Sequence, residues 1–548
     1  MPYVVTQSCC SDASCVLACP VNCIHPAPGE PGFAESEMVY IDAATCVDCG
    51  ACTTACPVDA IKPHTQLNEA ELPFIALASS YYQDFPHADR TPLALVPMVD
   101  RPRRGEEVRV AIVGAGPAAL YAADELLKYP DVVVDVIDRL PTPYGLVRAG
   151  VAPDHQRTKK AANLFGMIER EPGFGYLLNV RVGDHVSHAE LEEHYHGVIY
   201  ATGASSDRSM GIEGEDLPGS LSATSVVGWY NGHPDYRDLA VDLSSERVVI
   251  VGNGNVALDV ARILTLDPER LAATDIADHA LAALRASAVR EVVVLGRRGS
   301  DAAAFTVPEL IGLMSLADVD LVIEGEISGE GEAAKLLAEA AGRPTDPTRR
   351  RIVLRFNTAP VRVIGEGQVM GLEVAGTAVT PDGVTLTEER EILDTTLVLR
   401  SVGYRGVPIP DLPFNEATAT VPHEHGRVRT GTYVAGWIKR GPRGFIGTNK
   451  SCAEETVQSF LADLDAGRLS IPTGSRADFE KLVRSRQPDL IDSRGWAAID
   501  AHERAAGGDA RPRRKFTSTE EMVAVARPAQ TDRPGLNGSR RRRWNLLG

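Results

Sequence analysis

The chain has 548 residues, enough for three or four domains of roughly 150 residues each. Hydrophobic residues make up 44% and charged residues 24%, which excludes a long disordered or collagen-like chain. The formal net charge of −18 disfavours nucleic acid as a partner. The sequence has no apolar run near the ~20 residues that span a bilayer, and its start lacks the basic region of a secretion signal. We therefore expect a cytoplasmic protein with no membrane insertion.

Nine of the ten cysteines lie between Cys9 and Cys56. A reducing compartment disfavours a disulfide scaffold, so this grouping indicates metal ligands. The second run, Cys46-x2-Cys49-x2-Cys52-x3-Cys56-Pro57, has the spacing of bacterial ferredoxins. In that pattern three thiolates hold one iron–sulfur cluster and the fourth reaches a second cluster. Zinc, the alternative, does not require a doubled run with a proline after each last cysteine.

The first run repeats the spacing with Asp12 in place of the second cysteine. Three thiolates favour a [3Fe–4S] cluster beside Asp12, whereas a carboxylate ligand would retain a fourth iron and give a second [4Fe–4S] cluster. Cys10 and Cys23 are left over. Cys10 adjoins Cys9 and is an alternative ligand in its place, and we expect Cys23 to be a buried free thiol. Crossed pairing predicts a [4Fe–4S] site with Cys19, Cys46, Cys49 and Cys52, and a second site with Cys9, Cys15, Cys56 and, as a possible ligand, Asp12. Residues 1–65 resemble a seven-iron bacterial ferredoxin, a small α+β domain.

A connecting segment is expected over residues 66–107. It contains several prolines, is expected to be partly ordered, and ends in the basic stretch 101–104. The first 100 residues hold twelve acidic side chains against only Lys62 and Arg90. We therefore expect the acidic N-terminal part to dock on basic residues, with Arg101–Arg104 and Lys439, Arg440 and Arg443 as candidates.

The first α/β unit begins with an apolar strand, Val108–Val113, and a glycine turn that opens a helix. In the turn, Gly114 permits the tight bend and Gly116 lets a pyrophosphate approach the helix N-terminus. Asp138, at the end of the next strand, is placed to accept the ribose hydroxyls. Strand, turn, helix and acid together predict a dinucleotide site.

A second unit of the same kind begins at Arg247–Val251, followed by Gly252-Asn253-Gly254-Asn255-Val256. The strand Val292–Leu295 ends in Gly296-Arg297-Arg298. An acidic residue there would favour NAD, whereas guanidinium groups favour the 2′-phosphate of NADP. We therefore predict α/β architecture with two Rossmann-like nucleotide-binding lobes.

Residues from about 108 to 515 resemble the adrenodoxin reductase family of ferredoxin–NADP reductases. The matching segments are GAGPAA, PTPYGLVRAGVAPDH, YATGASSDR, GNGNVALDVARIL, GRRG, SVGYRG and GWIKRGPRGFIGTNK. The resemblance implies an FAD-binding domain over 108–204 and 400–515 and an NADP-binding domain over 205–399. A C-terminal extension, 516–548, follows. We expect the basic tail segments Arg511–Lys515 and Arg540–Arg543 to be solvated.

The same resemblance, together with the glycine turns, gives the candidate site residues. The FAD set is Gly114, Gly116, Ala118, Asp138, Leu146, Val182, Trp437, Gly444, Phe445, Ile446 and Gly447. The NADP set is Arg208, Asn253, Gly254, Asn255, Val256, Arg297, Arg298 and Glu309. His155, Asp259 and Glu309 are the catalytic candidates, as a His–carboxylate arrangement that relays protons; the alternative for His155 is a hydrogen-bonded loop residue.

These features predict a ferredoxin–NADP reductase with a fused ferredoxin. NADPH would pass a hydride to FAD, and single electrons would then move between FAD and the iron–sulfur clusters. The downstream partner would be a redox protein such as a cytochrome P450 or a separate ferredoxin. Two alternatives remain open: an electron-transfer subunit of the glutamate synthase small-subunit type, and a redox-sensing module without turnover. Cys452 has no CxxC partner, which excludes a dithiol mechanism.

Overall fold

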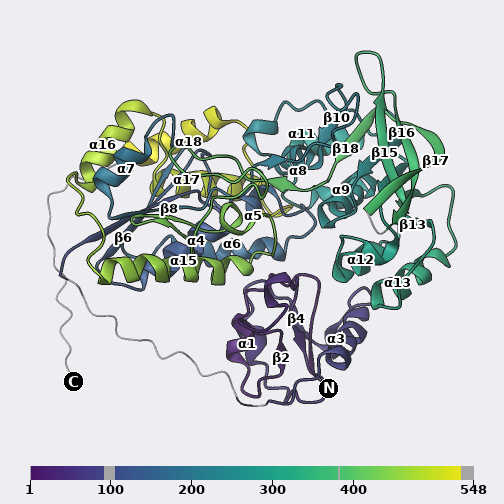
Figure 1. The fold of residues 1–548 in the computed structure, drawn as a ribbon, viewed down its shortest axis with the longest axis horizontal. Helices are drawn as coiled ribbons and strands as arrows, with labels where there is room; N and C mark the ends of the chain where they lie inside the picture. Colours follow the sequence, from purple (N-terminus) through teal and green to yellow (C-terminus); the bar gives the residue numbers. More distant parts are fainter. Residues whose placement is uncertain (1, 90, 92–104, 381–382, 532–548) are drawn as a thin grey trace.

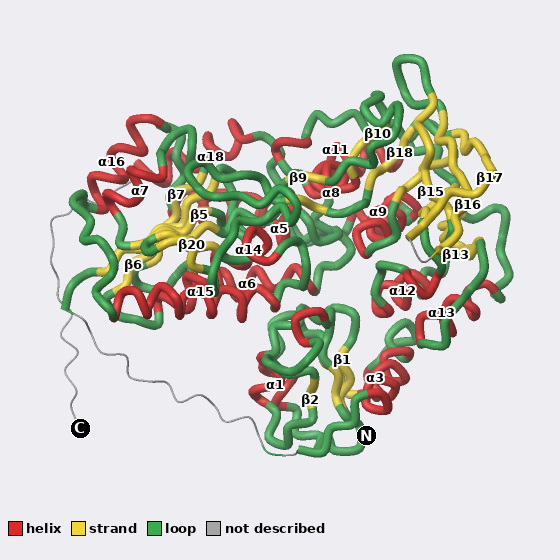
Figure 2. Tube along the Cα trace, viewed as in Figure 1, coloured by secondary structure: helices red, strands yellow, loops and turns green. Residues whose placement is uncertain are grey.

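The computed structural model describes residues 2–89, 91, 105–380 and 383–531 (Figure 1). Two large sheets with their helices lie side by side, and the cysteine-rich N-terminal body lies beneath the junction between them (Figure 1 and Figure 2). None of the described helices is long and apolar enough to cross a membrane. The predicted α/β architecture with a small added domain is confirmed.

The N-terminal body consists of short strands and helices. β1 (Tyr3–Val5) pairs antiparallel with β4 (Ile61–Pro63), and β2 (Ile24–His25) pairs antiparallel with β3 (Tyr40–Ile41). Each cysteine run continues into a short helix, α1 (Ser14–Ala18) or α2 (Ala51–Ala55). A longer helix, α3 (Pro73–Asp84), packs against β1 and β3. The range 66–107 therefore contains a helix docked on this body, while Arg101–Arg104 lies outside the described residues.

The first large sheet has the strand order β20-β21-β8-β5-β6-β7, and only the β20–β21 pair is antiparallel. Strands covered by helices on both faces need apolar residues throughout, and Val110–Ile112 of β5 is fully buried. The strands are β5 (Val108–Val113), β6 (Val132–Asp138), β7 (Phe174–Leu178), β8 (Gly197–Tyr200), β20 (Arg427–Arg429) and β21 (Thr432–Val434). The chain thus leaves this sheet after β8 and returns to it at β20.

The helices of the first lobe come from both parts of the chain. They are α4 (Pro117–Leu127), α5 (Leu146–Ala149), α6 (Ala161–Ile168), α7 (His188–His194), α14 (Trp437–Arg440), α15 (Thr448–Asp465), α16 (Arg476–Arg486), α17 (Ser493–Gly507) and α18 (Thr519–Thr531). α15 packs along α4, on the side of the lobe that faces the N-terminal body (Figure 1).

The second large sheet is parallel throughout, in the order β10-β18-β11-β12-β14-β13. Its strands are β10 (Ser220–Ser222), β11 (Arg247–Val251), β12 (Glu291–Leu295), β13 (Val319–Glu324), β14 (Arg350–Arg355) and β18 (Leu397–Arg400). Its helices are α8 (Ala223–Asn231), α9 (Asn255–Thr265), α10 (Pro268–Ala272), α11 (Asp278–Arg285), α12 (Val307–Met314) and α13 (Glu332–Ala341).

Two smaller sheets complete the fold. β15 (Thr358–Ile364), β16 (Gly371–Thr380) and β17 (Gly383–Asp394) form an antiparallel sheet beside the second lobe (Figure 1). β9 (Ser206–Asp207) pairs with β19 (Tyr404–Arg405). This ladder ties together the two segments in which the chain passes between the lobes.

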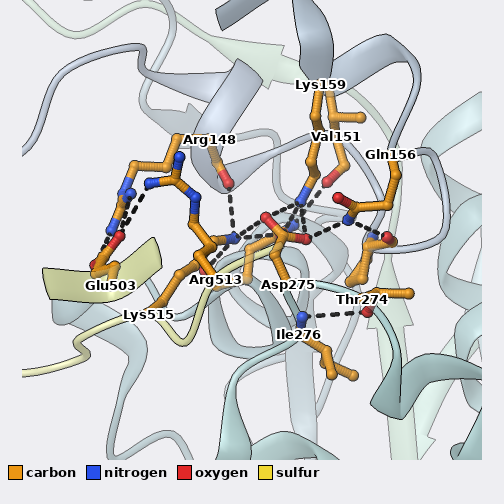
Figure 3. Close-up of polar contacts among 12 residues, drawn as sticks. Arg148, Val151, Gln156, Lys159, Thr274, Asp275, Ile276, Glu503, Arg513 and Lys515 are labelled. Atoms are coloured by element: carbon orange, nitrogen blue, oxygen red, sulfur yellow. Dashed lines mark hydrogen bonds and ion pairs between the residues drawn. The ribbon is translucent and has the colours of Figure 1, made fainter. Parts of the chain in front are cut away.

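The expectation that Arg511–Lys515 is solvated is wrong for most of its side chains. Lys515 is buried and pairs with Asp275 at 2.8 Å, and Arg513 pairs with the buried Glu503 at 3.1 Å (Figure 3). Buried carboxylates attract these cations because an unpaired buried charge is costly. Arg540–Arg543 lies outside the described residues.

Candidate functional site

Four thiols predicted for one cluster line a single hollow in the N-terminal body. They are Cys19, Cys46, Cys49 and Cys52. Burial, together with the neighbouring Cys46 and Cys49, raises the pKa of Cys52 to about 12. Thiolates gathered so closely repel one another unless a cation lies between them, so this donor set fits an iron–sulfur cluster. The leftover Cys23 lines the same hollow and is buried, with its Sγ 3.4 Å from that of Cys19.

The second predicted set also converges. Burial raises the pKa of Cys9 to about 12, with further contributions from Cys56 and Asp12. Burial also raises the pKa of Cys15 well above its ordinary value, and Cys9, Asp12 and Cys56 add to that effect. Asp12 is itself buried, and its carboxylate accepts a hydrogen bond from the Ser14 hydroxyl. The chain therefore places one carboxylate among three thiols.

The first glycine turn has the geometry that a dinucleotide site requires. Gly114 has φ 107°, and a Cβ there would lie 2.4 Å from the Ala201 carbonyl oxygen, so only glycine fits. A Cβ on Gly116 would meet no atom within 4 Å, which leaves the backbone open to approach. Asp138 is held at the turn because its carboxylate accepts hydrogen bonds from the N–H groups of Ala115 (2.7 Å) and Leu140 (2.8 Å).

A second loop of the first lobe meets this turn. Gly436 has φ 75°, and a Cβ there would lie 2.7 Å from the Cβ of Ala118, so the start of α14 lies against the start of α4. Trp437 begins α14, and its indole N–H donates to the Arg443 carbonyl at 3.1 Å. The loop Gly444–Gly447 then leads into α15 and is held by Asn449, whose amide donates to the carbonyls at 445 and 446 at 3.1 Å. Of the other FAD candidates, Leu146 begins α5 and is 39% exposed, and Val182 lies in a turn after β7.

The N-terminal body touches this loop directly. The Gly447 N–H donates to the Cys10 carbonyl at 2.8 Å. A Cβ on Gly447 would lie 2.0 Å from the Ser11 carbonyl oxygen, so the two backbones are in close contact. Cys10 and Ser11 fall between the predicted ligands Cys9 and Asp12. The second thiol set therefore lies next to the loop predicted to hold the flavin.

The second glycine turn repeats the first. Gly252 has φ 107°, and a Cβ there would lie 2.2 Å from the Ser401 carbonyl oxygen. The amide oxygen of Asn255 accepts from the Thr306 N–H at 2.9 Å, and that of Asn253 accepts from the Ala304 N–H at 3.3 Å. These bonds fix the polar side chains of the turn at the N-terminus of α9.

Two exposed arginines follow the neighbouring strand. Arg297 and Arg298 come after β12, and within the described ranges neither guanidinium has an ion-pair partner. Arg208 is exposed and lies beside Gly403, and its backbone N–H donates to the Gly403 carbonyl at 2.9 Å. The three exposed arginine side chains fit the charge of a phosphate group. The remaining candidate, Val256, follows Asn255 in the first turn of α9.

The three catalytic candidates converge around an arginine that the sequence reasoning missed. Ligand atoms of His155, Asp259 and Glu309 all lie within 4.8 Å of one another. Arg262 is buried among them and pairs with Asp154 at 2.7 Å and with Glu309 at 3.3 Å. The sequence does contain a signal for Arg262, because this residue follows Asp259 by three positions on α9 and so shares its helix face.

Arg262 also fixes the tautomer of His155. Its guanidinium lies 2.9 Å from the His155 Nε2 and has only protons to donate, so Nε2 accepts. The proton of the neutral ring is then on Nδ1, which lies 4.0 Å from the Glu309 carboxylate. Burial, reinforced by Asp259, raises the pKa of Glu309 to about 7. The arrangement can therefore hold and release a proton near neutral pH.

The N-terminal body contacts the first lobe through residues that were not predicted. Asp59 of the N-terminal body pairs with Lys160 of the lobe at 2.6 Å, and Glu71 pairs with Arg157 at 3.3 Å. The docking prediction for Lys439 and Arg440 is wrong. Lys439 is buried and pairs with Glu455, and Arg440 donates to Asn449 at 3.0 Å, because both cations fold back onto α15. Arg443 makes its described contacts inside the same loop.

Two polar residues of the N-terminal body reach the second lobe. The Gln7 amide donates to Glu309 at 3.4 Å, and Glu37 accepts from the Asn255 amide at 3.3 Å. Burial raises the pKa of Glu37 to about 7. Neither residue belongs to a motif, so the sequence offers no signal for them.

Family models match both parts of the chain. Residues 39–62 match the 4Fe-4S binding domain, and residues 108–296 match the pyridine nucleotide-disulphide oxidoreductases. Fold and site thus define an oxidoreductase with a pyridine-nucleotide domain and an iron–sulfur domain on one chain.

Proteins of similar sequence show to which family of oxidoreductases the chain belongs. A Mycobacterium tuberculosis protein named probable ferredoxin/ferredoxin–NADP reductase is 53% identical over 96% of each chain. A Mycobacterium leprae protein of the same name is 52% identical over 96% of this chain and 98% of its own. The structure of Mycobacterium tuberculosis FprA in complex with NADPH is 44% identical, with a TM-score of 0.74, and covers 77% of this chain and 100% of that chain. The chain belongs to the ferredoxin/ferredoxin–NADP reductase family.

Proposed function

We propose that this chain is an NADPH-dependent ferredoxin reductase that carries its own ferredoxin. The observation that carries the proposal is the hydrogen bond from Gly447 to Cys10, which joins the loop predicted to hold flavin to a predicted iron–sulfur site. The relatives that match 96% of the chain carry the corresponding name, which favours this function over a subunit of the glutamate synthase type.

FAD is assigned to the first lobe, 108–204 and 400–515. The open backbone at Gly116 and the N-terminus of α4 suit a pyrophosphate, and Asp138 suits the ribose. Ala118, Leu146, Val182 and Trp437 would line the rest of the site. The N-terminus of α15, after Gly444–Gly447, would stabilise negative charge on the bound ring system. When bound, the flavin supplies hydride acceptance and one-electron release.

NADP is assigned to the second lobe, 205–399. Asn253–Val256 and the N-terminus of α9 would hold the pyrophosphate, while Arg297 and Arg298 would hold the 2′-phosphate. Arg208 and Glu309 would complete the site. In this assignment Arg262 orients His155, and the Glu309 carboxyl takes up or returns a proton beside it.

The two thiol sets are assigned different positions in the electron path. The set of Cys9, Cys15 and Cys56, with Asp12, lies beside the flavin loop and is assigned a [3Fe–4S] cluster. The set of Cys19, Cys46, Cys49 and Cys52 is assigned a [4Fe–4S] cluster. Cys49 is exposed and Val47 is 58% exposed, so this second set is open to a downstream redox protein such as a separate ferredoxin or a cytochrome P450.

Nucleotide preference tests the assignment of the second lobe. The purified protein should reduce ferricyanide with NADPH in strong preference to NADH. Replacing Arg297 and Arg298 by alanine should raise KM for NADPH by about 10- to 100-fold, since a charge-assisted hydrogen bond contributes about 1.5–3 kcal/mol, and should leave KM for NADH nearly unchanged. Arg390→Ala, at an exposed arginine on β17, is the control. An equal loss with both nucleotides, or no loss, would contradict the assignment.

A further inference from the structure

Three metal-binding side chains meet in the N-terminal body away from the cysteine hollow. His25 ends β2, Glu30 lies in the loop that follows, and His87 follows the end of α3. Ligand atoms of these three residues all lie within 4.8 Å of one another. His25 is fully buried, and the other two are half-buried. The catalytic and electron-transfer assignments above use none of them.

The hydrogen bonds of His25 leave one ring nitrogen facing a carboxylate. Its Nε2 lies 3.0 Å from the Asn22 carbonyl oxygen, which can only accept, so Nε2 carries a proton. Its Nδ1 lies 3.1 Å from both Glu30 carboxylate oxygens. In the neutral ring Nδ1 has a lone pair, and two lone-pair donors at this distance repel each other. A cation must lie between them, either a second proton on the ring or a metal ion.

His87 favours the metal ion. Its ring lies against that of His25, with 3.6 Å between the ring centroids. The His87 Nε2 is buried, and it has no hydrogen-bond partner in the part of the chain that the structure describes. A buried polar atom without a partner destabilises the folded protein. A second proton on His25 would satisfy Glu30 but would leave the His87 nitrogen unsatisfied, whereas a metal ion would satisfy both.

We propose that His25 Nδ1, Glu30 and His87 Nε2 bind one divalent transition-metal ion, and that this ion is zinc. Two imidazoles and a carboxylate are a common zinc donor set, with water in the fourth position. Ligand atoms of a tetrahedral zinc site lie about 3.3 Å apart, and the three groups already lie within 4.8 Å of one another, so binding requires the ring of His87 to turn edge-on to the ion beside the ring of His25. The hydrogen bond from His25 Nε2 to a backbone carbonyl is also the usual outer contact of a metal-bound histidine.

The bound ion would fasten the end of α3 to the core of the iron–sulfur body. Tyr82 of α3 already donates to the carbonyls of Cys23 (3.0 Å) and Tyr40 (2.9 Å), so His87, which follows the end of the helix, would add a second attachment. Zinc has no redox chemistry of its own, so the site would stabilise the body without carrying electrons.

Metal analysis of the intact holoprotein tests the proposal. Elemental analysis should find about one zinc per chain in addition to the cluster iron. X-ray absorption at the zinc edge should show nitrogen and oxygen neighbours at about 2.0 Å. Zinc with sulfur neighbours at about 2.3 Å would show zinc misplaced in a cysteine site and would overturn the proposal, as would zinc-free protein with full iron content.

A variant pair assigns the ligands. His87→Gln should lower zinc by at least about fivefold while iron content and NADPH–ferricyanide activity stay unchanged, because His87 lies outside both thiol sets. Glu30→Gln, the second variant, should do the same. His64→Gln is the matched control: His64 is also half-buried in this body with an unpartnered ring nitrogen, but it belongs to no such group among the described residues. Undiminished zinc in both ligand variants would overturn the proposal.

Discussion

At the residue scale, the proposed composition of one cluster rests on Asp12. It occupies the place of a cysteine in an otherwise regular run, and the structure holds it among three thiols. A carboxylate is a weaker ligand for cluster iron than a thiolate, which is why we assign three irons to this site.

Replacing Asp12 by cysteine should convert this site to [4Fe–4S]. Iron content should rise from about seven to about eight per chain, and the EPR signal of an oxidised three-iron cluster should disappear. Cys10→Ser, at the neighbouring leftover cysteine, should change neither quantity. Identical iron content and spectra for Asp12→Cys and the parent protein would show that the site already holds four irons.

Glu309 gives a pH dependence whose sign follows from its surroundings. Burial and Asp259 raise the pKa of Glu309 to about 7 from an ordinary 4.5, so the folded protein binds this proton more tightly than the unfolded chain. The stabilisation is complete below the unfolded pKa and is lost as pH rises through 7. Between about pH 6 and about pH 8 the apparent Tm of Glu309→Gln should therefore fall less than that of the parent protein.

Differential scanning fluorimetry at the two pH values checks this prediction. Glu330→Gln, at an exposed glutamate, corrects for the change of charge and should follow the parent protein. A Glu309→Gln curve parallel to the parent curve would show that this carboxyl does not titrate differently on folding.

At the element scale, the C-terminal segment connects the two lobes. Lys515 donates to the carbonyls of Arg148 in the first lobe and of Asn231 in the second, both at 3.1 Å, and pairs with Asp275 (Figure 3). Burial raises the pKa of Asp275, but Lys159 and Lys515 outweigh it and hold that pKa below its ordinary value. A basic stretch at the end of a chain gives no sequence signal of this kind, because the partners of Lys515 lie more than 200 residues away in the sequence.

Removing the buried cation should destabilise the protein far more than removing an exposed one. Lys515→Met leaves Asp275 with one cation, Lys159, and the Gln156 amide, which should cost about 2 kcal/mol and lower the apparent Tm by several degrees. Arg514→Met removes an exposed pair with Asp278 and should cost less than about 1 kcal/mol. Equal Tm values for the two variants would contradict the connecting role.

The loop before α15 makes a close backbone contact with the iron–sulfur body, and a single methyl group should disturb it. Gly447 has φ −68°, so alanine is not strained there, but its Cβ would lie 2.0 Å from Ser11. Gly447→Ala should slow reduction of the clusters by NADPH at least about tenfold in stopped-flow absorbance, and should slow it by a larger factor than ferricyanide reduction at equal FAD content, because Gly447 also belongs to the predicted FAD set.

Gly331→Ala is the matched control for this substitution. It also has a negative φ, −76°, and a Cβ there would meet no atom within 4 Å. Unchanged cluster reduction in Gly447→Ala would show that electrons do not cross at this contact.

At the scale of the whole molecule, the features that could be predicted from the sequence are those that local patterns encode. The strand Val108–Val113, both glycine turns and both thiol sets could be predicted because spacing and periodicity are local properties. The contacts between the N-terminal body and the two lobes could not be predicted, because they depend on how separately folded parts of the chain meet. Lys439 and Lys160 are the same residue type, yet Lys439 pairs with Glu455 of its own lobe and Lys160 pairs with Asp59 of the N-terminal body.

The central claim is that electrons pass between NADPH and the iron–sulfur body within one chain. An anaerobic NADPH titration of the purified protein, followed by flavin absorbance and low-temperature EPR together, tests it most directly. We predict flavin bleaching accompanied by a change in the cluster EPR signals, with dithionite completing the reduction. Flavin bleaching with cluster signals that NADPH leaves untouched, but that dithionite alters, would contradict NADPH-driven transfer to the fused ferredoxin.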